Sequence, residues 1–231
     1  MGGEPMAVFL SLALPANVPQ KWVDRFYSGL LKLASRHGAA LAGGDTAQSP
    51  DGVLADIMVI GSVPRGRAIL RSSATVGDRI YVTGKLGSGG ATVRRLYAGE
   101  RIQPKGTYFY PEPRLEVGRK LRGIATAMID ISDGLSTDLA HLCDESNVGA
   151  ELYRSSIPVA SNAKLHDALD GGDDYELLFT SSKRVPDTIA ATAITEIGEI
   201  VKRKGMWIAD EKGTMKRLKA RGWEHFLRKR S

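Results

Sequence analysis

A chain of 231 residues is long enough for one large domain or two small ones, and its 42% hydrophobic and 25% charged residues exclude a disordered or fibrous protein. The formal net charge of +6 admits a nucleic-acid partner, but the basic residues are scattered among acids without a recognition motif, so we expect no nucleic acid. No apolar run approaches the ~20 residues that cross a bilayer, which favours a cytoplasmic location without membrane contact.

The first part of the chain predicts one helix among short strands. An apolar run from Pro5 to Pro15 indicates a buried strand. Residues 19–37 indicate a helix ending at Gly38, with one buried stripe formed by Trp22, Val23, Phe26, Leu30, Leu33 and Ala34. Further strands are predicted at residues 39–42, 53–63 and 68–71. These first ~75 residues, with one long helix, would form only a small hydrophobic core by themselves. We therefore expect an upstream segment or a partner chain to complete that core.

A polar turn at residues 74–78 separates this part from the rest, and we predict two domains, residues 1–75 and 76–231. Beyond the turn, a strand at residues 79–83 leads into the glycine-rich loop Gly84–Gly90. Helices are then predicted at residues 91–97, 114–121 and 135–143, and strands at residues 125–131, 150–153, 175–180 and 194–201. This alternation predicts an α+β fold, a two-domain layered α/β sandwich.

Several residues that often carry chemistry have a structural interpretation here. The loop Gly84–Gly90 lacks the order of a Walker P-loop, although backbone N–H groups at the helix start after it can hold an anion. Cys143 is the single cysteine, and its amphipathic helical surroundings favour a small apolar packing role. We place His166 in a loop, and we interpret it as structural together with His37, His141 and His225, because no nucleophile elbow or two-histidine metal spacing accompanies them.

Acidic residues follow two predicted strands. Gly43-Gly44-Asp45-Thr46 would turn tightly and place a carboxylate at a strand end, although for these four residues alone an ordinary turn with Asp45 bonded to its own backbone is favoured. Asp130 to Asp133 brings two carboxylates and the Ser132 hydroxyl to a strand-to-helix junction, which suits Mg2+ and phosphate oxygens. The alternative is that Ser132 or Asp133 caps the helix, but capping explains one acid and not both.

Two further features stay open on the residues alone. The glycines of Gly171-Gly172-Asp173-Asp174-Tyr175 indicate either close approach to a ligand or a tight turn. Arg71, at the end of its predicted strand, either reaches a nucleotide phosphate or forms an ordinary ion pair.

Together these motifs resemble the thiamine-monophosphate kinase family, part of the superfamily that includes aminoimidazole ribonucleotide synthetase and selenophosphate synthetase. The similarity spans nearly the whole chain, and each of its segments is weak alone but specific in this order. The segments are residues 7–15, 43–46, 77–84, 111–114, 129–135 and 171–180.

The resemblance implies an aminoimidazole ribonucleotide synthetase-like fold and direct in-line phosphorylation of thiamine monophosphate by ATP to give thiamine diphosphate. Carboxylates without a catalytic histidine suit that reaction, which needs positioning and charge neutralisation. It also implies that residues 1–75 bind ATP and Mg2+ and form a homodimer through a shared β-barrel. By resemblance, the ligand contacts are Mg2+ at Asp45, Asp130 and Asp133, ATP at Gly44, Asp45, Arg71 and Ser132, and thiamine phosphate at Asp173 and Trp223.

The chain departs from the family at three points. The family usually has glutamate where this chain has Asp173, and often tyrosine where it has Trp223. The family also carries an upstream Gly-Asp-Asp motif and further aspartates, and Met1-Gly2-Gly3 aligns just after it. We therefore expect an N-terminally truncated chain, an incomplete N-terminal domain and impaired transfer. A non-catalytic binding or scaffold fragment and a sister ATP-dependent synthetase remain the alternatives.

Overall fold

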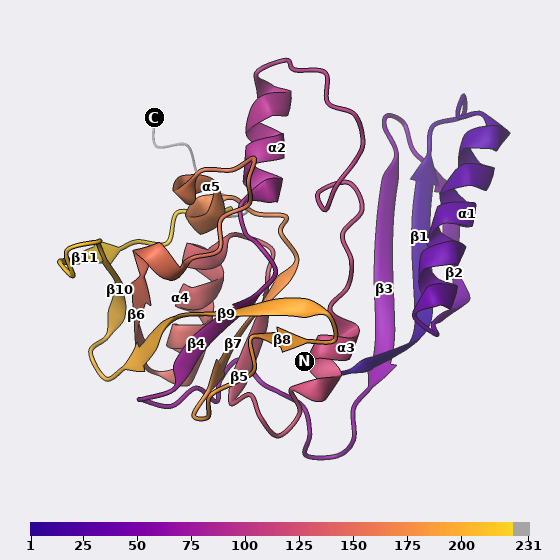
Figure 1. The fold of residues 1–231 in the computed structure, drawn as a ribbon. Coiled ribbons are helices and arrows are strands. Elements are labelled where there is room, and N and C mark those ends of the chain that lie inside the picture. The colour runs from indigo at the N-terminus through magenta and orange to yellow at the C-terminus, as the bar shows by residue number, and fades with distance from the viewer. Residues whose placement is uncertain (224–231) are drawn as a thin grey trace. The chain divides into compact units, whose positions relative to one another are not determined.

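The computed structural model describes residues 1–223 and divides into two compact units. Residues 3–66 form one unit, and residues 1–2 with the chain from Arg67 onward form the other. The predicted mixture of sheets and few helices is confirmed in both (Figure 1). Within the described residues, no helix combines the length and the apolar character needed to span a bilayer.

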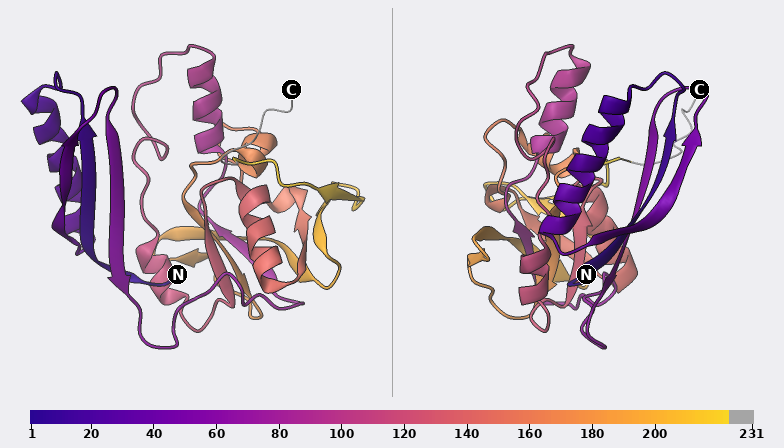
Figure 2. Two further views of the ribbon diagram at one scale, coloured as in Figure 1. Left: turned by 180° about the vertical axis from the view of Figure 1, so that it is seen from behind. Right: turned by 90° about the vertical axis from the view of Figure 1, so that its right-hand side faces the viewer.

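The first unit is a three-stranded sheet with one helix (Figure 2). Its elements are β1 (Glu4–Leu14), α1 (Gln20–Arg36), β2 (Ala40–Gln48) and β3 (Leu54–Ser62). β1 lies in the centre, parallel to β2 and antiparallel to β3. Ala34 of α1 packs against Val8, but Leu33 is 43% exposed, so the buried stripe of α1 is narrower than predicted.

The tetrapeptide Gly43–Thr46 was predicted as a turn, and this prediction is wrong. It lies inside β2 and pairs with residues 9–12 of β1, and the register shifts between Val8 and Phe9. A Cβ at Gly44 would overlap the carbonyl oxygen of Leu10, and the φ of Gly44 is 145°. The glycine therefore permits the close approach of two backbones just after a β-bulge, at which Ala42 is the extra residue.

One face of this small sheet is uncovered by any element of its own unit. Side chains alternate along a strand, so Phe9 and its partner Met58 lie on the face opposite to Val8 and α1. Leu54 and Ile60 share that face with them, and Leu54 and Met58 are each 60% exposed. Asp56, opposite Ser11, also lies on this face, so the face is largely and not wholly apolar. An uncovered sheet face with exposed apolar side chains is typical of an interaction surface.

The second unit contains an eight-stranded sheet in the order β11-β10-β6-β9-β4-β7-β5, with β8 paired to β9. Every strand pair is antiparallel except the parallel pair β6–β10. The strands are β4 (Arg79–Thr83), β5 (Ala127–Ile131), β6 (Gly149–Tyr153), β7 (Glu176–Ser181), β8 (Thr188–Ile189), β9 (Thr192–Val201), β10 (Gly205–Ala209) and β11 (Met215–Leu218).

Helices cover both faces of this sheet. The helices are α2 (Ser88–Tyr97), α3 (Leu115–Lys120), α4 (Leu135–Ser146) and α5 (Leu165–Asp170), with a short 3-10 turn at Arg154–Ser156. One core cluster joins α4 and α5 to the sheet through residues such as Leu139 and Ala168. A second cluster on the other face joins α3 to the sheet through Val117 and Phe179.

Two local predictions are wrong, and some elements were missed. Residues 68–71 form no strand, because the bond from the Met128 N–H to the Leu70 carbonyl and the bonds between Ile69 and Met1 do not make a ladder. His166 lies in α5 and not in a loop. The strands β10 and β11 were not predicted, and His225 lies outside the described residues.

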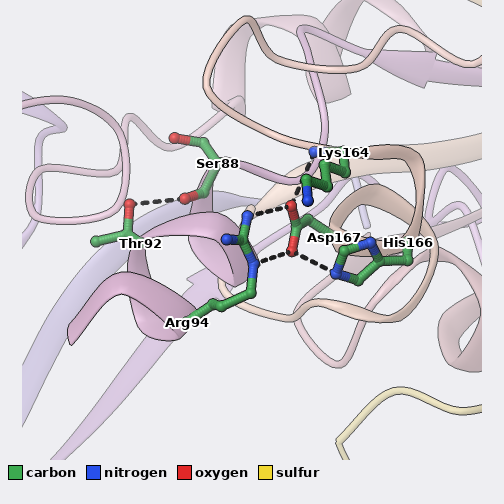
Figure 3. A network of polar contacts seen from close by, with 6 residues as sticks. All are labelled: Ser88, Thr92, Arg94, Lys164, His166 and Asp167. Carbon is green, nitrogen blue, oxygen red and sulfur yellow. Dashed lines mark hydrogen bonds and ion pairs between the residues drawn. The ribbon is translucent and has the colours of Figure 1, made fainter. Parts of the chain in front are cut away.

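A buried carboxylate ties α5 to α2 (Figure 3). Both oxygens of Asp167 accept hydrogen bonds from the Arg94 guanidinium, at 3.2 and 2.9 Å. The Lys164 backbone N–H donates to the same carboxylate at 2.8 Å, and His166 lies 3.1 Å from it. Burial opposes ionisation of Asp167, but the bonds from Arg94 and Lys164 prevail and lower its pKa.

A second ion pair joins α3 to the start of β7. Arg114 donates two hydrogen bonds to Glu176, at 2.8 and 2.6 Å, and the Thr83 hydroxyl of β4 donates to the same carboxylate. Glu176 is 4% exposed. This pair fixes the N-terminal end of β7, where the acidic loop Gly171–Tyr175 arrives.

Replacing Arg114→Met should lower the free energy of unfolding by about 3–5 kcal/mol, because it leaves the Glu176 carboxylate buried without its cation. Urea unfolding measures this loss. The double variant Arg114→Met, Glu176→Leu should recover much of it. Arg95→Met is the matched control, since Arg95 and Glu100 form an exposed pair and the change should cost no more than about 1 kcal/mol. Equal losses in both single variants would contradict the prediction.

Candidate functional site

Three loops of the second unit meet at one edge of its sheet because of the strand pairing. β5 and β7 are antiparallel and Ile131 pairs with Glu176, so the segment after β5 lies beside the segment before β7. β4 is also antiparallel to β7, which brings the Gly84–Gly90 loop to the same edge. Motifs far apart in the sequence are thereby neighbours in space.

The segment Ser132–Gly134 after β5 wraps around a carboxylate from α4. The backbone N–H groups of its three residues donate to Oδ2 of Asp138, at 3.1, 3.0 and 3.1 Å. Burial raises the pKa of Asp138 to about 6, although these hydrogen bonds oppose the shift, and the nearby charges of Asp133 and Asp130 add to it. The capping alternative is wrong, since neither Ser132 nor Asp133 makes a cap hydrogen bond to α4.

Asp130 and Asp133 are half-buried and both lie near Asp138. Their carboxylates accept no hydrogen bond and form no ion pair with any residue in 1–223. Two unpaired, partly desolvated carboxylates suit Mg2+, which takes one or two of them together with phosphate oxygens. Within the same range, no group of three or more His, Cys, Asp or Glu side chains is arranged to hold a metal ion by itself.

The loop Gly171–Tyr175 packs directly on the segment after β5. Its N–H groups at Asp173 and Tyr175 donate to the carbonyls of Ser132 and Ile131, at 2.9 and 2.8 Å. A Cβ at Gly172 would overlap the Ser132 carbonyl oxygen, so this glycine serves close approach to the chain's own backbone. Asp173 and Tyr175 have φ values of 64° and 53°, a strained conformation for residues other than glycine.

Aromatic side chains lie around this junction. The Tyr175 hydroxyl donates to Oδ1 of Asp173 at 2.8 Å. Burial, that hydrogen bond and the nearby Asp130 charge raise the pKa of Tyr175 to about 12, with a smaller effect from Tyr108. The backbone N–H of Trp223 donates to the Asp133 carbonyl at 2.9 Å, and the Trp223 side chain is 61% exposed. Asp173 and Trp223, both predicted to contact a substrate, therefore reach the Asp130–Asp133 junction.

The glycine-rich loop after β4 is held by a carboxylate of the protein. Asp174 accepts hydrogen bonds from the N–H groups of Gly87 and Gly89, at 2.6 and 3.1 Å. These N–H groups lie at the start of α2, where the sequence predicted that backbone N–H groups can hold an anion. In the structure the Asp174 carboxylate occupies the N–H groups of Gly87 and Gly89.

Gly44 and Asp45 lie in the first unit and line a pocket of about 380 Å³ with Leu10, Thr46, residues 41–43 and Tyr27 of α1. The Asp45 carboxylate accepts a hydrogen bond from the backbone N–H of Thr46 at 2.8 Å. A bond of Asp45 to its own backbone is what the sequence predicted as the alternative to a metal site. The sequence prediction did not include Tyr27. Its spacing placed it on a helix, but only the folded unit brings its ring to the glycines of β2.

The remaining candidates have local partners. Arg71 forms an exposed ion pair with Glu145 at 3.0 Å. Cys143 is buried in the α4 core, as predicted, and burial raises its pKa to about 12. A pocket of about 480 Å³ beside it is lined by α4, β10 and β11.

Comparison with protein families defines the class. The chain matches the model of the AIR synthase related protein N-terminal domain over residues 1–63 and that of the C-terminal domain over residues 75–208. These are the domains of an AIR synthase related protein.

Individual relatives narrow this class. The chain is 34% identical to thiamine-monophosphate kinase of Haemophilus influenzae, over 82% of this chain and 61% of that protein. It is 33% identical to thiamine-monophosphate kinase of Bacillus subtilis, over 98% of this chain and 76% of that protein. The solved complex of AaThiL with AMPPCP and TMP superimposes with a TM-score of 0.82 at 27% identity, over 97% of this chain and 75% of that chain. The chain thus belongs to the thiamine-monophosphate kinase family, as its motifs indicated.

Asp174→Asn should reduce the dependence of stability on pH. Burial raises the pKa of Asp174 from 3.8 to about 6, against the pull of the Gly87 and Gly89 hydrogen bonds. The folded protein therefore holds this proton more tightly than the unfolded chain. The stability it contributes is complete below about pH 4 and is lost as the pH rises through about 6, by up to roughly 3 kcal/mol. Asparagine does not titrate, so this decline should be absent.

Urea unfolding between about pH 4 and pH 7 measures the free energy of unfolding of the variant and the parent. The pKa of Asp138 is also raised to about 6, so a decline in stability due to Asp138 should remain in both proteins. Asp167→Asn is the control of opposite sign. Because the pKa of Asp167 is lowered, its contribution is present above about pH 4 and is lost only as the pH falls further. An unchanged slope in Asp174→Asn would contradict the prediction.

Proposed function

We propose that the chain catalyses the ATP- and Mg2+-dependent phosphorylation of thiamine monophosphate to thiamine diphosphate. The family relation and the AaThiL complex with AMPPCP, an ATP analogue, and TMP support this proposal. The observation that carries it is the convergence of the unpaired Asp130 and Asp133 carboxylates with Asp173 and Trp223 at one edge of the sheet. The relatives that the chain matches are longer than it is, so activity, substrates and partners all belong to this proposal.

The reaction needs no covalent enzyme intermediate. An oxygen of the acceptor phosphate forms a bond to the γ-phosphorus of ATP as the bond from that phosphorus to the β–γ bridging oxygen breaks, and ADP leaves. When bound, Mg2+ neutralises the charge on the transferring phosphate oxygens. Asp130, Asp133 and Asp45 are the proposed Mg2+ ligands. The protein's part is to orient donor and acceptor in line and to keep water away.

The two substrates are assigned to different sets of residues. We assign ATP to Gly44, Asp45, Arg71 and Ser132, and add Tyr27 as an aromatic surface for the adenine in the pocket beside Gly44. Arg71 would exchange Glu145 for a phosphate, at small cost because that pair is exposed. Asp173 and Trp223 are assigned to thiamine phosphate, with the Trp223 ring stacking on the thiamine ring. The cytoplasmic location also stays a prediction.

Asp133→Asn should lower the rate of transfer at least about 100-fold, because a metal ligand stabilises transition-state charge by several kcal/mol. Formation of thiamine diphosphate, followed by phosphorus NMR with MgATP and thiamine monophosphate, measures this. Glu100→Gln, an exposed acid on a different loop, is the control and should leave the rate unchanged.

We expect slow transfer by these 231 residues alone, since the Gly-Asp-Asp carboxylates that the resemblance assigns upstream are not among them. A rate comparable to that of full-length relatives would contradict this expectation. A dimer that binds no MgATP at millimolar concentration would favour the binding or scaffold alternative, and transfer to a different acceptor would favour a sister synthetase.

We also propose a homodimer formed through the uncovered face of the first sheet. The exposed apolar side chains of Leu54, Met58 and Ile60 support it, since burying them against a second copy would remove them from water.

Met58→Asp should weaken this association by about tenfold or more, because it places a charge in an apolar interface. Analytical ultracentrifugation measures the dissociation constant. Ser28→Asp, on the exposed side of α1, is the control and should have no effect. A parent chain that is monomeric at all accessible concentrations would exclude this dimer.

A further inference from the structure

Three consecutive peptide units after β5 are held from both sides. On one side, the N–H groups of Ser132, Asp133 and Gly134 all donate to the same Asp138 oxygen. Asp138 is 2% exposed, so water does not replace this acceptor. One buried oxygen therefore fixes the direction of three successive backbone donors.

On the other side, the carbonyls of the same peptide units accept hydrogen bonds from elsewhere in the chain. Ile131 accepts the Tyr175 N–H at 2.8 Å, Ser132 accepts the Asp173 N–H at 2.9 Å, and Asp133 accepts the Trp223 N–H at 2.9 Å. A peptide plane is rigid, so the orientation that directs its N–H to Asp138 also directs its carbonyl to these partners.

The residues joined in this way belong to both halves of the proposed reaction. Asp133 and the preceding Asp130 are the proposed cation ligands, whereas Asp173 and Trp223 are the proposed acceptor contacts. Glycines permit the close approach, since a Cβ at Gly172 would overlap the Ser132 carbonyl and one at Gly222 would overlap the Asp133 carbonyl. The backbone of residues 131–134 is thus a direct mechanical link between the two sets.

We propose that Asp138 is a positioning residue that couples cation binding at Asp130 and Asp133 to acceptor binding at Asp173 and Trp223, an inference that rests on the proposed function. Without its carboxylate, three N–H groups, of which that of Gly134 is buried, lose their acceptor and the peptide planes are free to rotate. Rotation would misdirect the Asp133 side chain and release the carbonyls that hold Asp173 and Trp223. Both binding sites should therefore weaken together.

Asp78, in the turn before β4, provides a matched control at the other end of β5. It is 1% exposed and accepts hydrogen bonds from the Thr75 N–H and from the Thr126 hydroxyl, next to the opposite end of β5. Replacing it removes a buried carboxylate with its hydrogen bonds and leaves the Ser132–Gly134 segment untouched. A loss of stability alone would appear equally in both variants.

The experiment compares parent, Asp138→Ala, Asp138→Asn and Asp78→Ala by two binding measurements that do not depend on turnover. Mn2+ binding is followed by electron paramagnetic resonance, and thiamine monophosphate binding by calorimetry with saturating Mg2+. Asp138→Ala should weaken both 10–100-fold, as expected for a residue that orients metal ligands. Asp138→Asn should stay within about fivefold of the parent, because the amide oxygen still accepts although without charge. Asp78→Ala should leave both constants unchanged.

The outcomes separate the two proposals. If the parent chain binds neither Mn2+ nor thiamine monophosphate, the proposed function fails. If the parent binds both and Asp138→Ala alters neither constant, only the role of Asp138 is overturned. If Asp138→Ala weakens the binding of Mn2+ or of thiamine monophosphate but not of both, the role of Asp138 is also overturned, because the proposed coupling requires both to weaken.

Amide hydrogen exchange in the parent chain tests the same point should Asp138→Ala fail to fold. The N–H groups of Ser132, Asp133 and Gly134 should exchange at least about 100-fold more slowly than that of the exposed Gly106, and thiamine monophosphate should slow them further together with that of Asp173. Exchange as fast as that of Gly106 would overturn the proposal.

Discussion

The antiparallel pairing of β5 with β7 is the constraint on which the site in the second unit depends. Ile131, the last residue of β5, pairs with Glu176, the first residue of β7. The segment that follows β5 and the segment that precedes β7 therefore lie at the same edge of the sheet. β4, paired with β7, brings the glycine-rich loop to the same place. A shift of one residue in this register would turn Asp130 toward the opposite face, so the apolar residues that fix the register, such as Met128 and Phe179, also fix the chemistry.

The acids at this edge divide into two groups by what surrounds them. Asp138, Asp174 and Glu176 are buried and accept hydrogen bonds from backbone N–H groups or from Arg114, so they hold loops in place. Asp130 and Asp133 have no partner within residues 1–223 and remain available to a cation. Phosphoryl transfer depends on positioning and charge neutralisation, and this division provides a separate set of residues for each task.

Local patterns predicted the elements whose signals are local. α1, β1 and β5 follow from periodicity and from their bounding Gly, Pro and Asp residues, and the acids after β5 were found because two carboxylates end an apolar strand. Asp138 was missed because a polar residue inside an amphipathic helix looks like a solvated position until the loop before it folds back. The Gly43–Thr46 segment of β2 was mistaken for a turn, since consecutive glycines permit both a turn and a strand, and only pairing with β1 decides. Tyr27 and Gly222 depend on contacts across the fold that no short pattern contains.

The run Asp173-Asp174-Tyr175-Glu176 has consequences for sequence change. Asp174 and Glu176 reach into the protein in different directions, toward the N–H groups of Gly87 and Gly89 and toward Arg114. Within residues 1–223, the Asp173 side chain is hydrogen-bonded to the Tyr175 hydroxyl alone. Side-chain length can therefore vary at position 173 without disturbing an anchor. Inserting or deleting one residue in this run would exchange an anchor for a ligand-facing side chain, so mutational drift there should proceed by substitution and not by change of length.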